Sequence, residues 1–211
     1  MNSTVSMHDN HLHSTAKYDA PKDFEHVFEV MSQPSFLHMS GLGGEQPFYI
    51  CDYPASSELE VRECIAALVS RLQTTKYSDG SPAPRILRID LFESVCEFLR
   101  HRGVLNRVIG MVNATTNNLY DFLAERYEQA FEDGEADIVF LTGIGAVYPY
   151  VRGHTLLNNL QGRIERSPLV LFFPGTYAQS SASGSSMRLY DQVEADNYYR
   201  AKNIREVSVI H

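Results

Sequence analysis

The sequence is poor in cysteine, in long apolar runs and in positive charge. Its 211 residues include three cysteines, an odd number without C-x-x-C spacing. We expect inert core thiols, and a chain of this length needs no disulfide to be stable. No apolar run approaches the roughly 20 residues that cross a bilayer, and the first residues lack the basic flank and apolar stretch of an export signal. We therefore expect a cytoplasmic protein without a membrane segment.

The shortage of positive charge bears on nucleic-acid binding. A formal net charge of −8 opposes attraction over the whole surface, because such binding depends on Lys and Arg neutralising phosphates. The charge is uneven: residues 121–137 hold seven acids and one base, whereas residues 85–107 hold five arginines and three acids. The acidic run indicates either a solvated helix face or a docking surface for a basic partner. Direct DNA binding is expected to be weak or absent, with a local contact through arginines of 85–107 and 152–166 as an alternative.

A nucleotide-hydrolysing motif is also lacking. The first predicted strand, residues 48–53, is followed by DYPASSE, where a P-loop would place GxxxxGK[ST]. This corner has no lysine or glycine, Pro54 removes an amide donor, and two carboxylates would each repel a triphosphate by roughly 1–4 kcal/mol. Those carboxylates belong to Asp52 and Glu58. Asp52 is expected instead to cap the following helix or to bond nearby amides. No catalytic residue, metal ligand or cofactor is therefore assigned.

Apolar periodicity predicts alternating strands and helices. We predict strands at residues 48–53, 86–91, 138–142 and 169–173, and helices near 24–31, 61–72, 92–100, 105–132 with a break at 113–117, and 155–165. A capping box, Ser57-x-x-Glu60, is expected to open the second of these helices. Buried strands alternating with helices of 10–15 residues are typical of a parallel sheet. The expected fold class is α/β: three layers, with a mostly parallel, twisted sheet flanked by helices, Rossmann-like or P-loop-like without a Walker A motif.

Residues 21–211 are expected to form one domain. Residues 1–20 are polar and aperiodic and indicate a flexible arm, whose three histidines lack a second set of metal ligands. The serine-rich stretch at residues 178–187 predicts a mobile loop, and residues 207–210 resemble a terminal β-strand.

The turn T-G-I-G, after the third predicted strand, is a weak candidate for an anion site. Thr142, Gly143 and Gly145 permit a tight turn whose amides could hold an anion with help from Arg152. A dinucleotide fingerprint would need a third glycine that opens a helix, and Tyr148 stands in that region instead. Binding of a nucleotide or another anion without hydrolysis is therefore an alternative function.

Polar residues after this turn have no clear catalytic pattern. His154 has no serine or cysteine nucleophile in an elbow nearby, so acid–base catalysis is not expected. Asn158 and Asn159 are unfavourable in the middle of a helix, so they face a polar partner or bond neighbouring backbone.

Tyrosines are frequent at the predicted strand ends. They are Tyr53, Tyr148, Tyr150, Tyr177, Tyr198 and Tyr199. Such an aromatic set suits the core of a protein interface. Packing of loops with the hydroxyl groups in water is the alternative.

Four sequence blocks carry a family resemblance. They are FYICDYP, TGIGAVYPYVRGHTLLNNLQ, PLVLFFPGTY and DNYYR, the last of which contains Asn197, Tyr198 and Arg200. In this order and at these distances, the blocks resemble the BrxB family of the BREX phage-defence systems of bacteria and archaea. The resemblance spans about residues 23–205.

The resemblance implies a role in binding partners. BrxB proteins act alongside PglZ, an alkaline-phosphatase-like protein, the large ATPase BrxC and the adenine methyltransferase PglX in marking host DNA and blocking phage. The family has no established catalytic residues that could be carried over. The resemblance therefore implies a non-catalytic adaptor that docks on PglZ through its strand ends or its acidic helix, with BrxC and PglX as further partners.

Overall fold

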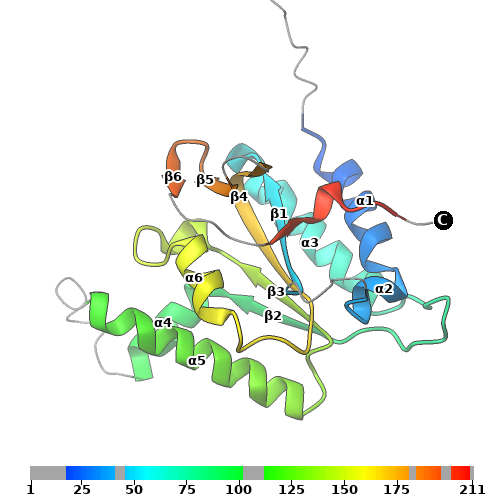
Figure 1. Cartoon of the computed structure of the whole chain (residues 1–211), viewed down its shortest axis with the longest axis horizontal. Coiled ribbons are helices and arrows are strands. Elements are labelled where there is room, and N and C mark those ends of the chain that lie inside the picture. Colours follow the sequence, from blue (N-terminus) through cyan, green and yellow to red (C-terminus); the bar gives the residue numbers. More distant parts are fainter. Residues whose placement is uncertain (1–17, 41–45, 102–111, 181–183, 196–200, 210–211) are drawn as a thin grey trace, which may run out of the picture.

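A computed structural model shows a central β-sheet between two layers of helices (Figure 1). It describes residues 18–40, 46–101, 112–180, 184–195 and 201–209. The expected α/β class with a mostly parallel sheet is confirmed. Within these ranges, every helix is too short or too polar to cross a membrane.

Five parallel strands form the centre of the sheet. They are β1 (Phe48–Tyr53), β2 (Ile86–Asp90), β3 (Ile138–Thr142), β4 (Leu169–Ser180) and β7 (Lys202–Asn203). Their order is β2-β3-β4-β1-β7, and each neighbouring pair runs parallel. All of β1, nearly all of β3 and the first half of β4 are buried, as their uninterrupted apolar sequences predict.

Helices cover both faces of this sheet. One layer contains α1 (Ala20–Met31), α2 (Pro34–Leu37) and α3 (Glu58–Leu72), and the other contains α4 (Leu91–His101), α5 (Val112–Glu132) and α6 (Gly153–Leu160). Short 3₁₀ turns follow β1, β3 and β7: η1 (Ala55–Ser57), η2 (Gly145–Val147) and η3 (Ile204–Glu206). Because strand side chains alternate, Phe140 packs in the core under α3, and Leu141 packs in the core under α5 and α6.

β4 continues beyond the edge at which β1 and β3 end. β1 pairs with it as far as Pro174, and from Gly175 onward it pairs antiparallel with β5 (Gly184–Leu189). β6 (Val193–Ala195) extends this hairpin, which stands at the upper left of Figure 1. A side chain at Gly175 would clash, because its Cβ would lie 2.1 Å from the carbonyl oxygen of Arg188.

The expected loop at residues 178–187 is wrong where the structure describes it. Residues 178–180 end β4, and residues 184–187 begin β5. Strand pairing satisfies the backbone there, and the hairpin buries Tyr177 and Met187 on one face while the residues of the other face, Thr176 and Arg188 among them, are exposed. The serine-rich composition indicated a loop, but residues 178–180 and 184–187 pair as antiparallel strands.

Three smaller expectations are also wrong. α5 runs through residues 113–117 without a break, because the helix-propensity penalties of Asn and Thr are at most about 0.7 kcal/mol each. Ser57 precedes α3, but its side chain makes no capping hydrogen bond, since the chain enters the helix from the turn η1. Residues 207–209 are not a strand; the C-terminal segment pairs with β1 only at Lys202–Asn203.

Candidate functional site

β1, β2 and β3 end at one edge of the sheet, which we call the carboxyl edge. In sheets of this type, ligands and partners bind at this edge. Polar residues stand at all three strand ends: Asp52 in β1, Asp90 in β2 and Thr142 in β3. The turns that follow contain most of the residues that the sequence singled out.

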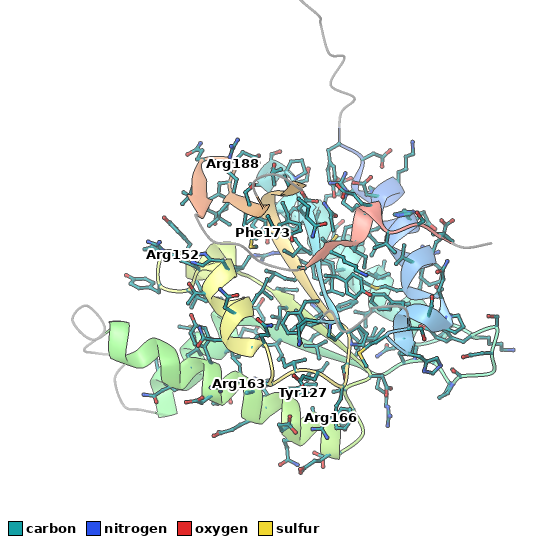
Figure 2. The ribbon with its side chains drawn as sticks, viewed as in Figure 1. Tyr127, Arg152, Arg163, Arg166, Phe173 and Arg188 are labelled. Atoms are coloured by element: carbon teal, nitrogen blue, oxygen red, sulfur yellow. The ribbon has the colours of Figure 1, made fainter. Side chains whose placement is uncertain are left out.

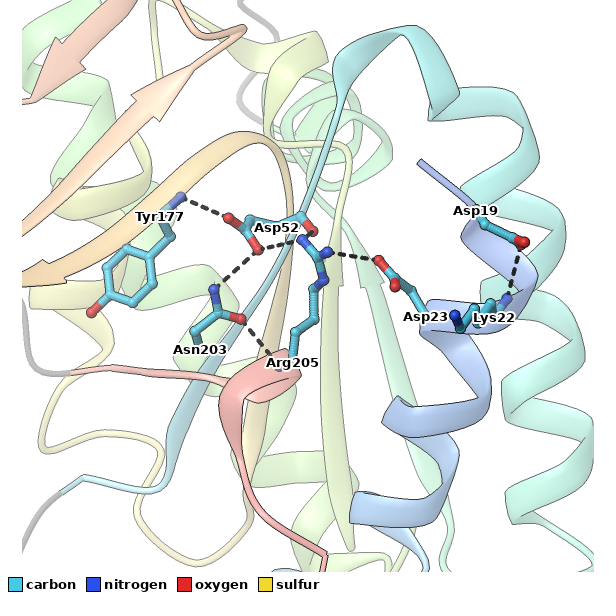
Figure 3. Close-up of polar contacts among 7 residues, drawn as sticks. All are labelled: Asp19, Lys22, Asp23, Asp52, Tyr177, Asn203 and Arg205. Atoms are coloured by element: carbon cyan, nitrogen blue, oxygen red, sulfur yellow. Dashed lines mark hydrogen bonds and ion pairs between the residues drawn. The ribbon is translucent and has the colours of Figure 1, made fainter. Parts of the chain in front are cut away.

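Asp52 is the centre of a buried polar cluster (Figure 3). The residue is 6% exposed. Its Oδ2 accepts a hydrogen bond from the backbone amide of Tyr177 at 2.9 Å, and its Oδ1 accepts from Asn203 at 3.1 Å and from Arg205 at 3.2 Å. Of the two roles expected for Asp52, bonding to nearby amides is therefore observed, and its partners come from β4, β7 and η3 rather than from the following helix.

Arg205 connects this cluster to α1. Its guanidinium also donates to the carbonyl oxygen of Asp52 at 3.2 Å and forms an ion pair with Asp23 Oδ2 at 2.8 Å. Burial lowers the pKa of Arg205, but the carboxylates of Asp23 and Asp52 outweigh burial and raise the pKa overall. The guanidinium is thus a permanent cation between two acids, and the cluster ties the C-terminal segment to β1 and α1.

Tyr53, Glu58 and Arg62 form a separate cluster beside α3. The hydroxyl of Tyr53 donates to Glu58 Oε2 at 2.7 Å, and Arg62 Nε donates to Glu58 Oε1 at 2.8 Å. Burial and the neighbouring Glu58 raise the pKa of Tyr53, so its hydroxyl stays protonated. Both carboxylate oxygens of Glu58 thus accept hydrogen bonds, as do both oxygens of Asp52. The acids of the corner after β1 are therefore hydrogen-bonded to other groups of the protein.

Asp90 and Thr142 meet where β2 and β3 end. Thr142 Oγ1 donates to Asp90 Oδ2 at 3.2 Å, and the amide of Glu93 donates to Asp90 Oδ1 at 3.0 Å. Asp90 therefore satisfies an amide in the first turn of α4. Gly143 has a φ of +77°, and a Cβ there would lie 3.1 Å from the Asp90 carboxylate. Glycine is required at position 143 for two reasons: the backbone has a positive φ, and the Asp90 carboxylate lies too close for a side chain.

The second glycine of this turn makes room for the hairpin. A Cβ at Gly145 would lie 2.5 Å from the hydroxyl of Tyr190 and 3.1 Å from Pro174. A tyrosine side chain thus occupies the space beside Gly145. Arg152, which was expected to help this turn hold an anion, lines a different hollow from Thr142 and Gly143.

Tyr148, Arg152 and His154 line that hollow, which apolar side chains of β4 and β5 close. Its volume of about 30 Å³ has room for about one water molecule. His154 Nε2 lies 3.0 Å from Thr155 Oγ1. Burial and the charge of Arg152 lower the pKa of His154, so the ring is neutral at pH 7. Among the described residues, no serine or cysteine lines this hollow.

Other predicted site residues have structural positions. Asn158 is exposed, and the side-chain amide of Asn159 donates to the carbonyl oxygen of Thr155 at 2.8 Å. Tyr177 is buried, and its hydroxyl donates to the carbonyl oxygen of Ala201 at 2.7 Å. Outside the described residues lie Asn197, Tyr198 and Arg200.

The acidic run along α5 is partly neutralised within the domain. Its ion pairs join Asp121 to Arg163, Glu128 to Arg166 and Asp137 to Arg85. Figure 2 shows Arg163 and Arg166 beside α5, which they reach from the connection between α6 and β4. Both the acidic run and the arginine runs are therefore less strongly charged than the sequence suggests, which weakens the case for α5 or these arginines as a charged docking surface.

Exposed apolar side chains gather at the carboxyl edge. In the described part of the chain, the large ones are Leu59 (77% exposed), Phe92 (53%), Tyr150 (56%) and Tyr190 (39%). We call these four residues the edge set. Leu59 follows β1, Phe92 follows β2 and Tyr150 follows β3. Tyr190 lies in the turn between β5 and β6. The edge where ligands and partners usually bind is thus also the edge where this chain exposes apolar surface.

Several site residues had escaped sequence reasoning. They are Arg62, Asp90, Asn203 and Arg205, whereas Arg88 had been considered only as one of the arginines of residues 85–107. Asp90 ends a predicted strand, so the rule that singled out Asp52 would also have found it. The others have no local signal, because their surroundings are built by segments distant in the sequence.

Comparison with known proteins establishes the family. A family model described as "BREX protein BrxB" matches residues 87–204. The chain is 36% identical over 195 residues to BREX protein BrxB of Bacillus cereus (strain H3081.97), covering 84% of this chain and 93% of that protein. The chain belongs to the BrxB family.

Further comparisons agree with this membership. BREX protein BrxB of Escherichia coli O9:H4 (strain HS) is 32% identical over 185 residues, covering 81% of this chain and 84% of that BrxB protein. No solved structure matches. The expected family resemblance is confirmed, and BrxB membership makes the chain a component of a BREX phage-exclusion system.

Proposed function

We propose that this BrxB-family chain is a non-catalytic adaptor that docks on the PglZ alkaline-phosphatase-like protein through its carboxyl edge. In this role it supports host DNA methylation and phage restriction without a reaction of its own. The edge set carries the proposal, because exposed aromatic and aliphatic side chains that become desolvated supply most of the energy of a protein interface.

The state of the acids supports an adaptor rather than a hydrolase. Asp52, Glu58 and Asp90 each accept hydrogen bonds on both carboxylate oxygens. A general base must reach the proton that it removes, and these oxygens are directed at groups of the protein. The carboxyl edge therefore favours contact over chemistry.

The choice of PglZ as the partner rests on what the family resemblance implies. PglZ is the first choice, and BrxC and PglX are further partners to test in the same way. Tyr148 and Arg152 lie beside the edge set in sequence and line its neighbouring hollow, so they belong to the surface under test.

Co-purification with tagged PglZ tests the proposal. Wild-type protein should form a stoichiometric complex, and the double variant Leu59→Ser/Tyr150→Ser should bind at least about 30-fold more weakly, since an interface hot spot contributes 2 kcal/mol or more. Tyr148→Ala and Arg152→Ala should weaken binding less. Thermal unfolding of each variant shows whether the fold is retained.

Glu132→Ser provides the matched control, because Glu132 is exposed at the opposite end of the strands, where α5 leads into β3. It should leave PglZ binding unchanged. A wild-type complex that tolerates Leu59→Ser/Tyr150→Ser would show that the carboxyl edge is not the docking surface. Capture of BrxC or PglX in place of PglZ would overturn the choice of partner.

A further inference from the structure

A cleft lies between α3 and the carboxyl ends of β2 and β3, apart from the Asp52 cluster. Its volume is about 190 Å³. Its polar lining consists of Tyr53, Glu58, Arg62, Arg88, Asp90 and Thr142. Two acids and two arginines make the lining formally neutral, so its binding preference depends on which of these groups are already engaged.

The acids of the cleft are engaged. Glu58 accepts from Tyr53 and Arg62, and Asp90 accepts from Thr142 and from the amide of Glu93. Each of the four carboxylate oxygens thus already has a donor. The acids hold the walls of the cleft in place and have little left to offer a cation.

The arginines of the cleft have donors to spare. A guanidinium carries five N–H groups. Arg62 uses only Nε, toward Glu58, among its described contacts. Arg88 is exposed and makes no hydrogen bond or ion pair with any residue that the structure describes. Hydrogen-bonding to Glu58, aided by the charge of Asp90, raises the pKa of Arg62, so this donor stays charged.

Arg88 also stands at an unusual place in the sheet. Along β2, alternate residues share a face, and Ile86 on the same face packs in the α3-side core. Arg88 lies opposite Phe140, a fully buried residue of β3. If this position of β2 served only to pack against the core, an apolar residue would be expected there. An inward charge on an edge strand also hinders pairing with other chains, and the experiment below separates this role from ligand binding.

We propose that this cleft binds a phosphate group between the guanidinium groups of Arg62 and Arg88. Guanidinium donors on two walls suit an oxyanion with more than two acceptor oxygens, which can bond to both arginines at once. The volume is below the roughly 300–1,000 Å³ of sites that enclose drug-sized ligands, so the cleft holds the phosphate and not the rest of a nucleotide. The neighbouring acids keep the affinity modest, with a dissociation constant on the order of 1 mM.

NMR titration of the full chain tests this site. Side-chain Nε–Hε signals of arginine report directly on the guanidinium groups. Sodium phosphate should shift the signals of Arg62 and Arg88 in a saturating manner at constant ionic strength, which holds screening fixed. Adenosine monophosphate forms the second arm: equal affinities show that free phosphate suffices, and tighter binding of the nucleotide identifies a terminal nucleotide phosphate as the source.

Variants make the test specific. Arg88→Gln should weaken phosphate binding at least about 10-fold, because one charge-assisted contact is lost. Arg100→Gln removes the same charge from an exposed site in the last turn of α4 and should change affinity little. Asp90→Asn removes a negative charge but keeps an acceptor for Glu93, so it should strengthen binding by about 5-fold.

Two outcomes would overturn the phosphate proposal. If the signals of Arg62 and Arg88 do not move, or if Arg88→Gln and Arg100→Gln behave alike, the cleft is not a phosphate site and Arg88 serves only to protect the sheet edge. Because none of these measurements involves PglZ, failure here leaves the docking proposal untouched, and loss of docking leaves the phosphate site untouched.

Discussion

Asp52 and Asp90 lie at the carboxyl ends of two parallel strands, yet their surroundings differ. Asp52 is buried and receives hydrogen bonds from Tyr177 in β4 and from Asn203 and Arg205 in the C-terminal segment. Asp90 is half-buried and receives hydrogen bonds from the next helix and from the neighbouring strand.

The difference follows from the place of each strand in the sheet. β1 is flanked by β4 and β7, and the C-terminal segment that forms β7 delivers the side chains that close the cluster around Asp52. β2 is at the edge of the sheet, so no such segment covers its end within the part of the chain that the structure describes. The same residue type is therefore buried in a hydrogen-bonded cluster at one corner and half-buried in the wall of a cleft at the other.

Asp52→Ala should have the largest effect. It leaves the Tyr177 amide without its acceptor and removes one of the two acids that balance the half-buried Arg205. We expect the free energy of unfolding to fall by about 3–5 kcal/mol, measured by chemical denaturation. Glu135→Ala, at an exposed position, should change it by at most about 0.5 kcal/mol. A loss below about 1 kcal/mol for Asp52→Ala would mean that the cluster does not hold the C-terminal segment in place.

Asp90→Ala should cost less. It removes the acceptor for the amide of Glu93 in the first turn of α4 and for the hydroxyl of Thr142. Because water can replace these bonds at a half-buried site, we expect a loss of about 1–2 kcal/mol by the same measurement. A loss as large as that of Asp52→Ala would erase the distinction between a buried and a half-buried acid.

Arg88→Gln should leave stability nearly unchanged. Arg88 is exposed and has no described partner, so its free energy of unfolding should differ from wild type by at most about 0.5 kcal/mol. A clear destabilisation would show that the guanidinium supports the fold rather than a ligand. Equilibrium denaturation without phosphate measures this, because bound anion would stabilise the wild type by mass action.

The smallest effect is expected at His154. Its folded-state pKa lies below the ordinary value near 6.5, because of burial and then of Arg152. As pH falls below the unfolded pKa, the unfolded state binds a proton that the folded state does not, so stability decreases until the folded pKa is reached. Arg152→Gln should raise the pKa of His154 by a few tenths of a unit, as measured by NMR titration. An unchanged or lower pKa would show that Arg152 does not act on this ring.

The positions of the strand-end residues could be predicted where the information was local. The corners after β1 and β3 were found from buried strands and the residues that follow them, so Asp52, Thr142 and Gly143 were located correctly at the carboxyl edge. Arg152 was expected to help the turn after β3, but it lines a different hollow from Thr142 and Gly143, which its position in the sequence did not show. The hairpin of β4 and β5 was missed because serine and glycine carry no apolar alternation.

Local sequence patterns were sufficient to predict the layers, most of the helices, four central strands and the family, because apolar periodicity and ordered motifs are properties of neighbouring residues. Tertiary structure alone decided which polar groups meet. The partners of Asp52 lie 125, 151 and 153 residues away, and only the order of strands in the sheet brings them together. The same order leaves β2 at the edge, which is why Arg88 faces an open cleft.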